Sequence, residues 1–447
     1  MKKFAQTLLA ALVVASSLGL TAPASAQLNT RLVSNLPLGA GNGEVWAEGN
    51  YAYVARGHSG LAIIDISNPA APVAQGTILP FPHACISDVQ VIGNLAYLSN
   101  EITNGSPTPH VGMFIFDVSN PLAPVELSRL EWGAGGGYHL GCDAHSVTVD
   151  EPVPGTRVAY LNSGITGDLA LFDVSNPAVP VYLSQILSPV WAYYSQAHDC
   201  VVRNGRVYTS WLGGGFTVHD VSIPTAPVQL AHQPNANVNT VFTYHMALSS
   251  DGLSLLTTEN TTGTDSVRVW NISNLGAITL SGSFVSPGGA TPHQVSVLGK
   301  YAYVACLTDG LRILDISNPA APLSVGQYDP EAGSGGAFVG GYSVFPTANN
   351  IYLSHTSGGL YTIGSVDTIT ITKADWRKNS KVLVVEATST GAPSVALNVT
   401  GRGAMTYNVS LNKYTLTQTG VLANPGTVTV TSDLGGTRSS SVRRVNN

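Results

Sequence analysis

Short apolar runs, separated by Gly, Pro, Asn and Asp, recur along most of the chain. In one representative stretch the runs cover 294–298, 301–306 and 311–316, and a fourth run follows Pro322. Runs of this length with turn residues between them are typical of β-strands rather than helices. The pattern therefore predicts an all-β fold built from units of four short strands.

The units repeat. The segment 61–72, Leu-Ala-Ile-Ile-Asp-Ile-Ser-Asn-Pro-Ala-Ala-Pro, returns almost unchanged at 311–322. Related copies surround Asp117, Asp173, Asp220 and Asn271, and a degenerate seventh copy covers 359–364. A period of about 50 residues is typical of β-propeller blades. We predict a seven-bladed β-propeller in which each Asp-Ile-Ser-Asn-Pro segment is a turn between the third and fourth strands.

The two ends of this repeat region complement each other. The seventh unit lacks a fourth strand, whereas Arg31 to Pro37 resembles a fourth strand without the three that should precede it. We expect this N-terminal strand to close the ring, which removes free sheet edges. The predicted propeller spans 27–365.

The remaining segment, 366–447, predicts a small β-sandwich. Its expected strands, read from alternating apolar and polar residues, are 368–373, 381–387, 394–399, 407–411, 414–418 and 427–431.

The repeated units resemble the LVIVD repeat family and the choice-of-anchor B group of exported bacterial proteins. The resemblance rests on the recurring Asp-[Ile/Val]-Ser-Asn-Pro signature and covers about residues 28–365. It implies a propeller fold and leaves the activity open. The chain departs from the group name, because we find no sorting anchor at its end.

The first 26 residues resemble a signal peptide. Lys2 and Lys3 precede an apolar stretch from Leu8 to Leu20, and Ala24-Ser25-Ala26 has the small residues of a cleavage site. The stretch is too short for a membrane span. We expect a bacterial protein exported to the periplasm or the extracellular space, without a membrane span and monomeric.

Charged residues are distributed unevenly along the mature chain. Residues 27–365 carry 9 Lys and Arg against 22 Asp and Glu, whereas 366–447 carry 9 against 4. An acidic body repels nucleic acid and attracts cations. We expect no nucleic-acid partner, and no phosphate-cradling loop that would indicate a nucleotide cofactor.

Four consecutive units place a histidine at the entry of their first strand, the innermost strand of a propeller blade. Neutral imidazoles near carboxylates suit Zn, Cu, Mn or Fe. The candidate metal ligands are His145, His198, His245, His293 and Glu259. Second-shell or alternative ligands are Glu44, Asp88, Glu101, Asp143 and Asp199. The alternative is that these histidines only bond neighbouring blades or channel water.

Aromatic residues gather in the loops on the same face, where they form a candidate platform for a sugar or a peptide, or cover the blade ends. They are Trp132, Tyr138, Trp191, Tyr193, Tyr194, Phe242 and Tyr244. Cys85 and Cys142 fall at the same rim of adjacent blades, so we predict a disulfide between them. We expect Cys200 and Cys306 to be separate buried thiols.

Two functions from different classes remain open at this point. The first is a binding or adhesion protein that recognises a carbohydrate, a peptide or a surface protein on its loop-rich face. The second is a metal-dependent hydrolase, lyase or oxidase that uses the histidine cluster. The sequence shows no established acid–base pair, and this favours the first.

Overall fold

The computed structural model describes residues 26–79, 84–101, 111–131, 144–153, 155–163, 167–190, 195–261, 265–331, 339–365, 367–393, 395–433 and 435–446. Within these ranges the chain consists of β-strands joined by turns, with three short 3-10 helices and no α-helix. The all-β prediction is confirmed. None of the described helices is long and apolar enough to cross a membrane.

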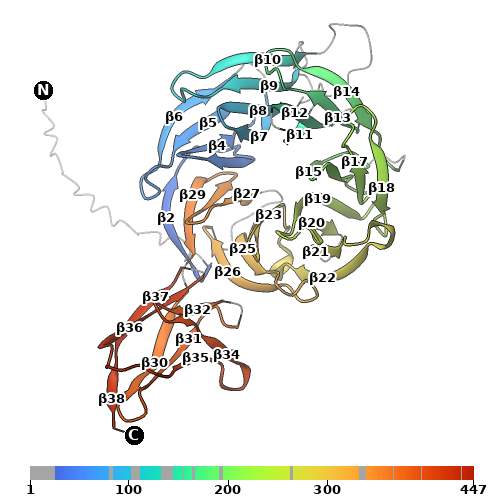
Figure 1. Ribbon diagram of the computed structural model, residues 1–447. Helices are drawn as coiled ribbons and strands as arrows, with labels where there is room; N and C mark the ends of the chain where they lie inside the picture. Colours follow the sequence, from blue (N-terminus) through green and yellow to red (C-terminus); the bar gives the residue numbers. More distant parts are fainter. Residues whose placement is uncertain are drawn as a thin grey trace, which may run out of the picture.

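Within the described residues, seven sheets follow one another around a central opening (Figure 1). The first holds β3 (Val45–Glu48), β4 (Tyr51–Ala55), β5 (Leu61–Asp65) and β6 (Val73–Ile78). The second holds β7 (Ile86–Ile92), β8 (Leu95–Asn100), β9 (Val111–Asp117) and β10 (Val125–Glu131). The third holds β11 (Ala144–Val153), β12 (Thr156–Ser163), β13 (Leu169–Asp173) and β14 (Val181–Ile186).

The fourth sheet holds β15 (Asp199–Arg203), β16 (Arg206–Ser210), β17 (Phe216–Asp220) and β18 (Val228–Gln233). The fifth holds β19 (Val241–Leu248), β20 (Ser254–Thr261), β21 (Ser266–Asn271) and β22 (Thr279–Val285), with the 3-10 helices η1 (Leu275–Ala277) and η2 (Pro287–Gly289) beside it. The sixth holds β23 (Gln294–Leu298), β24 (Tyr301–Cys306), β25 (Gly310–Asp315) and β26 (Leu323–Asp329). The bounds of β23 and β24 are those predicted from the sequence.

The N-terminal strand closes the ring. β2 (Thr30–Leu36) pairs antiparallel with β29 (Gly359–Ser365) and completes the seventh sheet beside β28 (Ile351–His355) and β27 (Gly341–Pro346). The predicted closing role of Arg31 to Pro37 is therefore confirmed. A shorter strand that was not predicted, β1 (Ala26–Leu28), extends the sixth sheet at β26.

The repeated turn is held by its own side chains. The Asp65 carboxylate accepts a hydrogen bond from Ser67 N at 2.8 Å, and Asn68 Oδ1 accepts one from Ala70 N at 3.2 Å. The same pair of bonds recurs at 117–122, 173–178 and 315–320. Side-chain acceptors of this kind stabilise tight turns, so the turn interpretation of the motif is confirmed.

These turns also hold the sheets to one another. In several outer strands a serine at a bulge donates to the carbonyl of the proline in the next turn. The bonds are Ser34 to Pro69 at 2.6 Å, Ser128 to Pro177 at 2.6 Å and Ser184 to Pro224 at 2.5 Å. Gly282 occupies the corresponding place in β22, where an added Cβ would lie 2.5 Å from the carbonyl oxygen of Ala320. The close approach explains why this position holds a small residue.

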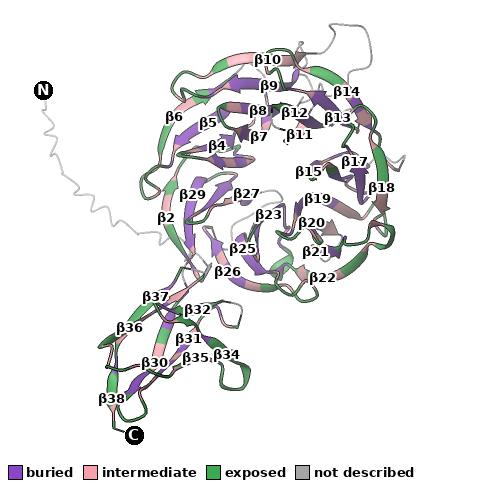
Figure 2. Ribbon diagram, in the orientation of Figure 1, coloured by how far each residue is buried: buried purple, intermediate pink, exposed green. Residues whose placement is uncertain are grey.

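Burial is greatest in the middle strands of each sheet and lowest at the rim of the ring (Figure 2). The second and third strands of each sheet are almost fully buried, whereas the outer strands β10, β14, β18 and β22 are exposed along much of their length. The apolar core therefore lies between neighbouring sheets, and each sheet depends on its neighbours for burial.

Residues beyond 366 form two further sheets next to β2, β26 and β29 (Figure 1). One contains β30 (Ile369–Arg377), β31 (Val382–Ser389), β34 (Thr406–Asn408), β35 (Lys413–Gln418) and β38 (Arg443–Val445). The other contains β32 (Leu397–Val399), β33 (Gly403–Ala404), β36 (Thr427–Ser432) and β37 (Thr437–Ser441). Lys300 Nζ lies 3.0 Å from Asp433 Oδ2 across the junction with the ring.

One predicted strand in this segment is wrong in part. The expected strand 407–411 ends at Asn408, and residues Val409–Leu411 form the 3-10 helix η3. The cause is local, because Asn408 Oδ1 accepts a hydrogen bond from Leu411 N at 3.0 Å and so caps the helix.

Candidate functional site at the centre of the ring

A cavity of about 480 Å³ lies at the centre of the ring, and its lining includes residues from the first strand of every one of the seven sheets or its entry. The cavity reaches from the histidines at one end to Arg203 at the other. The four in-register histidines, His145, His198, His245 and His293, all line it. Their sequence register therefore corresponds to a shared position in space.

Aromatic rings form an arc at one end of this cavity. The ring centroids of His145 and His198 lie 4.3 Å apart, and the Tyr244 ring lies 5.0 Å from that of His198. Tyr244 is in turn 6.1 Å from His293, whose ring lies 4.0 Å from that of Tyr342. We call these five residues the aromatic arc. Tyr342 takes the place of the histidine in the seventh sheet.

Two histidines of the arc are held in the same way by the sheet that follows them. His198 Nδ1 lies 3.2 Å from the Tyr244 carbonyl oxygen, and His293 Nδ1 lies 3.0 Å from that of Tyr342. A carbonyl oxygen only accepts, so each Nδ1 carries the proton and donates. When these rings are neutral, each Nε2 therefore offers a lone pair, and no described residue bonds to either Nε2.

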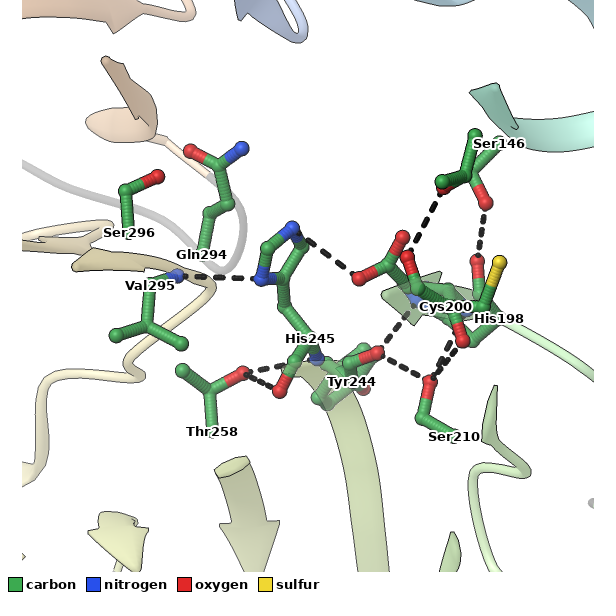
Figure 3. A network of polar contacts seen from close by, with 12 residues as sticks. Ser146, His198, Cys200, Ser210, Tyr244, His245, Thr258, Gln294, Val295 and Ser296 are labelled. Atoms are coloured by element: carbon green, nitrogen blue, oxygen red, sulfur yellow. Dashed lines mark hydrogen bonds and ion pairs between the residues drawn. The ribbon is translucent and has the colours of Figure 1, made fainter. Parts of the chain in front are cut away.

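His245 is oriented by two neighbouring sheets (Figure 3). Its Nδ1 accepts a hydrogen bond from Val295 N at 3.4 Å, and its Nε2 lies 3.2 Å from Asp199 Oδ2. Since Nδ1 is an acceptor, Nε2 carries the proton and faces the carboxylate. Both nitrogens of this ring are thus engaged, unlike those of His198 and His293.

His145 faces a carboxylate of the preceding sheet. Its Nδ1 lies 3.5 Å from Glu101 Oε2. Burial lowers the pKa of His145, but Glu101 and the negative charges of Asp88 and Asp199 outweigh that cost, and the net result is a raised pKa. In return, the hydrogen bond with His145 stabilises the charged form of Glu101 and lowers the pKa of that carboxyl group. This is the one histidine of the four that favours a positive charge.

The remaining three histidines favour the neutral form. Burial is the main cause, and it lowers the pKa of His245 and of His293 to about 3. The pKa of His198 falls well below its ordinary value through burial and through the charges of the other three histidines. These rings act as neutral hydrogen-bonding groups near pH 7.

Buried carboxylates share the cavity with these rings. Burial raises the pKa of Asp88 and of Asp199 to about 7, and the charge of Asp199 adds to the shift of Asp88. Burial and the charge of Asp88 raise the pKa of Glu44 well above its usual range. Each negative charge here is costly because its neighbours repel it and little water reaches it.

Several lining side chains hold neighbouring sheets together. Asp88 Oδ2 accepts from Val147 N at 2.9 Å, and Gln90 makes two bonds to the backbone of Val149 at 2.7 and 2.9 Å. Gln294 accepts from Val344 N at 2.5 Å and donates to Glu44 Oε2 at 2.7 Å. The predicted alternative, bonding between blades, therefore accounts for part of the cavity lining.

The described residues contain no group of three His, Cys, Asp or Glu side chains placed to hold one metal ion. The orientation of two histidines nevertheless suits metal binding. His198 and His293 leave Nε2 open while a backbone carbonyl fixes the opposite nitrogen, which is the usual orientation of metal-bound imidazoles. The metal expectation stays a prediction.

Glu259 is placed differently from the expectation. It is 1% exposed, is not among the residues that line the cavity, and lies 3.0 Å from Arg268 Nη1 on the next strand of its own sheet. Burial raises its pKa to about 7 in spite of the arginine. The Glu259 carboxylate contacts Thr257 and Arg268 of its own sheet, and the strand-end argument did not consider these partners.

Some of the predicted residues lie outside the described residues, and their roles stay predictions. They are Trp132, Tyr138, Cys142, Asp143, Trp191, Tyr193 and Tyr194. The Cys85–Cys142 disulfide is therefore untested. Cys200, on β15, and Cys306, on β24, are buried and form no disulfide within the described residues.

Sequence reasoning did not single out Gln294 or Tyr342 as site residues. Gln294 follows His293 directly, and Tyr342 occupies the histidine position of the seventh unit. The alignment of the repeated units on their first strands was the feature of the sequence that could have identified both residues. Phe242, from the predicted platform, lies on β19 and is half-buried.

The repeat signature has a direct counterpart among known families. The family model described as LVIVD repeat matches residues 41–79 and 288–330, which include the first and sixth sheets of the ring. The chain carries LVIVD repeats. Among the curated proteins no relative matches this LVIVD-repeat chain.

Solved structures share the fold of the LVIVD-repeat ring at low sequence identity. The β-propeller domain of Cps50 (Swd1) from Myceliophteria thermophila is 12% identical, with a TM-score of 0.52 over 74% of this chain and 99% of that one. YCF48 bound to a D1 peptide is 11% identical, with a TM-score of 0.51 over 76% and 99%. A functionally unknown protein from Desulfotomaculum acetoxidans is 13% identical, with a TM-score of 0.51 over 72% and 92%. The fold is a β-propeller.

Proposed function

We propose that this LVIVD-repeat chain is an exported binding protein whose ligand site is the central cavity beneath the aromatic arc. The proposal includes seven propeller blades over 27–365, a β-sandwich over 366–447 and a signal peptide over 1–26. The propeller supplies a rigid site, and the basic C-terminal segment would tether or space it at a surface. The compartment is the periplasm or the extracellular space.

One observation carries the proposal. The cavity holds about 480 Å³, a volume within the range of small-molecule sites, and neutral histidines with open Nε2 atoms face it. No described protein group bonds to these two nitrogens, so each is available to accept a hydrogen bond from a ligand. Open, oriented acceptors beside aromatic rings favour recognition of a ligand.

The partner class stays broad at this level. A carbohydrate, a peptide or a segment of a surface protein fits a cavity lined by both aromatic and polar groups. YCF48, which shares the fold, is bound to a peptide in its structure, and this makes a peptide segment one reasonable candidate.

A thermal-shift screen tests the proposal. Amines, neutral sugars, carboxylates and short peptides would each be added to the full chain and to a His198→Ala/His293→Ala variant. We expect at least one class to raise the melting temperature of the wild type and not that of the variant, because a ligand stabilises only the state that binds it. Equal shifts in both proteins, or no shift from any class, would contradict the proposal.

A metal-dependent hydrolase, lyase or oxidase is the second candidate. The observation that favours it is the orientation of His198 and His293 by backbone carbonyls. Zn, Cu, Mn or Fe are the metals that imidazole suits. Metal analysis of protein purified without chelator or His tag is the test. About one metal per chain, lost in the double variant, would favour the enzyme.

A further inference from the structure

The hydrogen-bond donors that line the cavity are largely occupied. Their protons go to backbone carbonyls of neighbouring sheets rather than to the cavity. The bonds are Ser146 to His198 O at 3.0 Å, Thr148 to Cys200 O at 2.9 Å, Ser296 to Val344 O at 3.0 Å and Gln90 to Val149 O at 2.9 Å. Gln294 donates to Glu44 at 2.7 Å.

The acceptors in the same lining are not all occupied. His198 Nε2 and His293 Nε2 have no hydrogen-bond partner among the described residues. Asp199 lies in the same wall, and its Oδ2 atom is 3.2 Å from the protonated Nε2 of His245, so this carboxylate supplies negative charge rather than an open acceptor. A ligand in the cavity can donate to His198 Nε2 and to His293 Nε2. The cavity therefore has unused acceptors and few unused donors.

The carboxylates and an aromatic ring of the cavity lining also favour a cationic ligand. Asp88 and Asp199 lie close enough for their charges to repel, and Glu44 adds a third carboxylate near Asp88. A positive group between them would offset that repulsion. The Tyr342 ring lines the cavity 4.0 Å from the His293 ring, and an aromatic ring of this kind attracts a cation. The carboxylates also offset the positive charge that His145 favours.

We propose that the cavity binds an organic cation that carries several N–H donors, a primary ammonium or a guanidinium group. Its N–H groups would donate to His198 Nε2 and His293 Nε2, and the charges of Asp88 and Asp199 would attract it. This inference rests on the proposed binding function and names its ligand class. An anion or a donor-poor ligand would leave the same acceptors unbonded.

A metal ion fits the lining less well than an organic cation. His198 and His293 each offer an open Nε2, whereas His145 favours the protonated form. Both nitrogens of His245 are engaged, by Val295 and Asp199. The Asp88 carboxylate already accepts from two backbone N–H groups, at 2.6 and 2.9 Å. A ligand with its own directional N–H groups matches scattered acceptors without drawing them into one coordination sphere.

Isothermal titration calorimetry on the full chain tests the inference with named probes. Putrescine and agmatine supply ammonium and guanidinium groups, 1,4-butanediol has the same carbon chain without charge, and succinate reverses the charge. ZnCl₂ is added as a separate arm. We expect putrescine or agmatine to bind and butanediol and succinate not to bind at the same concentrations.

Two cavity variants and one matched control locate the binding. Asp199→Asn removes a negative charge and His293→Leu removes an open acceptor, and each change should weaken binding at least tenfold. Asp117→Asn makes the same chemical change in an exposed turn and should leave binding unaltered. Melting temperature and circular dichroism establish which variants are folded, and either cavity variant alone is sufficient for the test.

The outcomes separate this inference from the proposed function. Binding of butanediol, succinate or zinc without binding of either amine would overturn the organic-cation assignment while leaving a ligand site in place. Amine binding that both cavity variants retain would also overturn it. No binding by any probe, together with a thermal-shift screen without hits, would overturn both proposals.

Discussion

Gln294 Nε2 donates a 2.7 Å hydrogen bond to Glu44 Oε2, although 250 positions separate the two residues. The Oε1 atom of the same side chain accepts from Ser343 Oγ at 2.8 Å and from Val344 N at 2.5 Å. One amide therefore joins the sixth sheet, the seventh sheet and the entry of the first. The ring is closed from the inside at Gln294 as well as from the outside by β2.

Replacing Gln294 by Met keeps the length of the side chain and removes these three bonds. Buried polar groups on Val344 and Glu44 would lose a partner, and each such loss costs about 1–3 kcal/mol. We expect the free energy of unfolding to fall by about 3 kcal/mol in chemical denaturation. Gln229→Met, on the exposed outer strand β18, should change it by less than about 0.5 kcal/mol. Equal stability of the two variants would contradict the closing role of Gln294.

Asp199 should make the protein less stable as pH rises. Its pKa is raised by burial from 3.8 to about 7, so the folded state holds a proton that the unfolded state releases. Stability is therefore lost as pH rises from about 4 to 7 and then levels off. At about 1.36 kcal/mol per pKa unit the effect is at most about 4 kcal/mol.

The variant Asp199→Asn isolates this effect. His245 and His293, with pKa values of about 3, contribute in the opposite sense, because their stabilisation is lost as pH falls below 6.5. The wild-type curve mixes both, whereas the difference between variant and wild type reports Asp199. We expect the variant to gain stability relative to wild type between pH 5 and 8, by urea denaturation. Asp117→Asn should show no such pH dependence, since the pKa of Asp117 lies below its ordinary value.

Nuclear magnetic resonance can identify which nitrogen of each histidine carries the proton. Nitrogen-15 NMR of histidine-labelled protein at pH 7 should show neutral Nδ1–H rings for His198 and His293 and a neutral Nε2–H ring for His245. The reason is the partner atom, a carbonyl for the first two and a backbone N–H for the third. His145 should titrate above the ordinary value because Glu101 faces it. An Nε2–H ring at His293 would contradict the geometry proposed for ligand binding.

Gly282 offers a test of the contacts at the rim of the ring. An added Cβ would lie 2.5 Å from Ala320 O and 2.6 Å from Pro319 O, both backbone atoms of the next turn. Gly282→Ala should lower the free energy of unfolding by about 1–3 kcal/mol, because the sheets must separate to admit it. At Gly276 the nearest atom to an added Cβ, Asn274 Oδ1, lies 3.3 Å away. A melting-temperature comparison in which Gly276→Ala is the more damaging would refute this account.

The sequence predicted the ring well because the residues that end each strand recur at a regular spacing. Gly, Pro and Asn mark the end of each strand, and β23 and β24 have the predicted bounds. The strands β33, β37 and β38 were missed. β33 and β38 have only two or three residues, and β37 (Thr437–Ser441) contains no apolar residue that could alternate with its polar ones. In the strand expected at 407–411, the capping bond of Asn408 prevailed over the apolar pattern.

The sequence register brought the four histidines to one cavity but did not predict their chemistry. Which nitrogen of His198 or His293 is protonated depends on a carbonyl in the following sheet, about 50 residues along the chain. Glu259 shows the same limit, because its partner Arg268 lies on the adjacent strand rather than in the cavity. The position of a residue within its repeat predicts its place in the fold. Its hydrogen-bond and ion-pair partners lie on neighbouring strands and sheets, and the repeat does not predict them.

The pairing of β2 with β29 has a consequence for how the chain reaches its folded state. β2 is synthesised before the three other strands of its sheet, and its partner β29 is among the last elements of the ring to be made. Contacts this distant in sequence slow folding, and an incomplete ring exposes the edge of its seventh sheet. During that interval the open edge invites pairing with another copy, so chaperone protection should matter more for this chain before closure than after it.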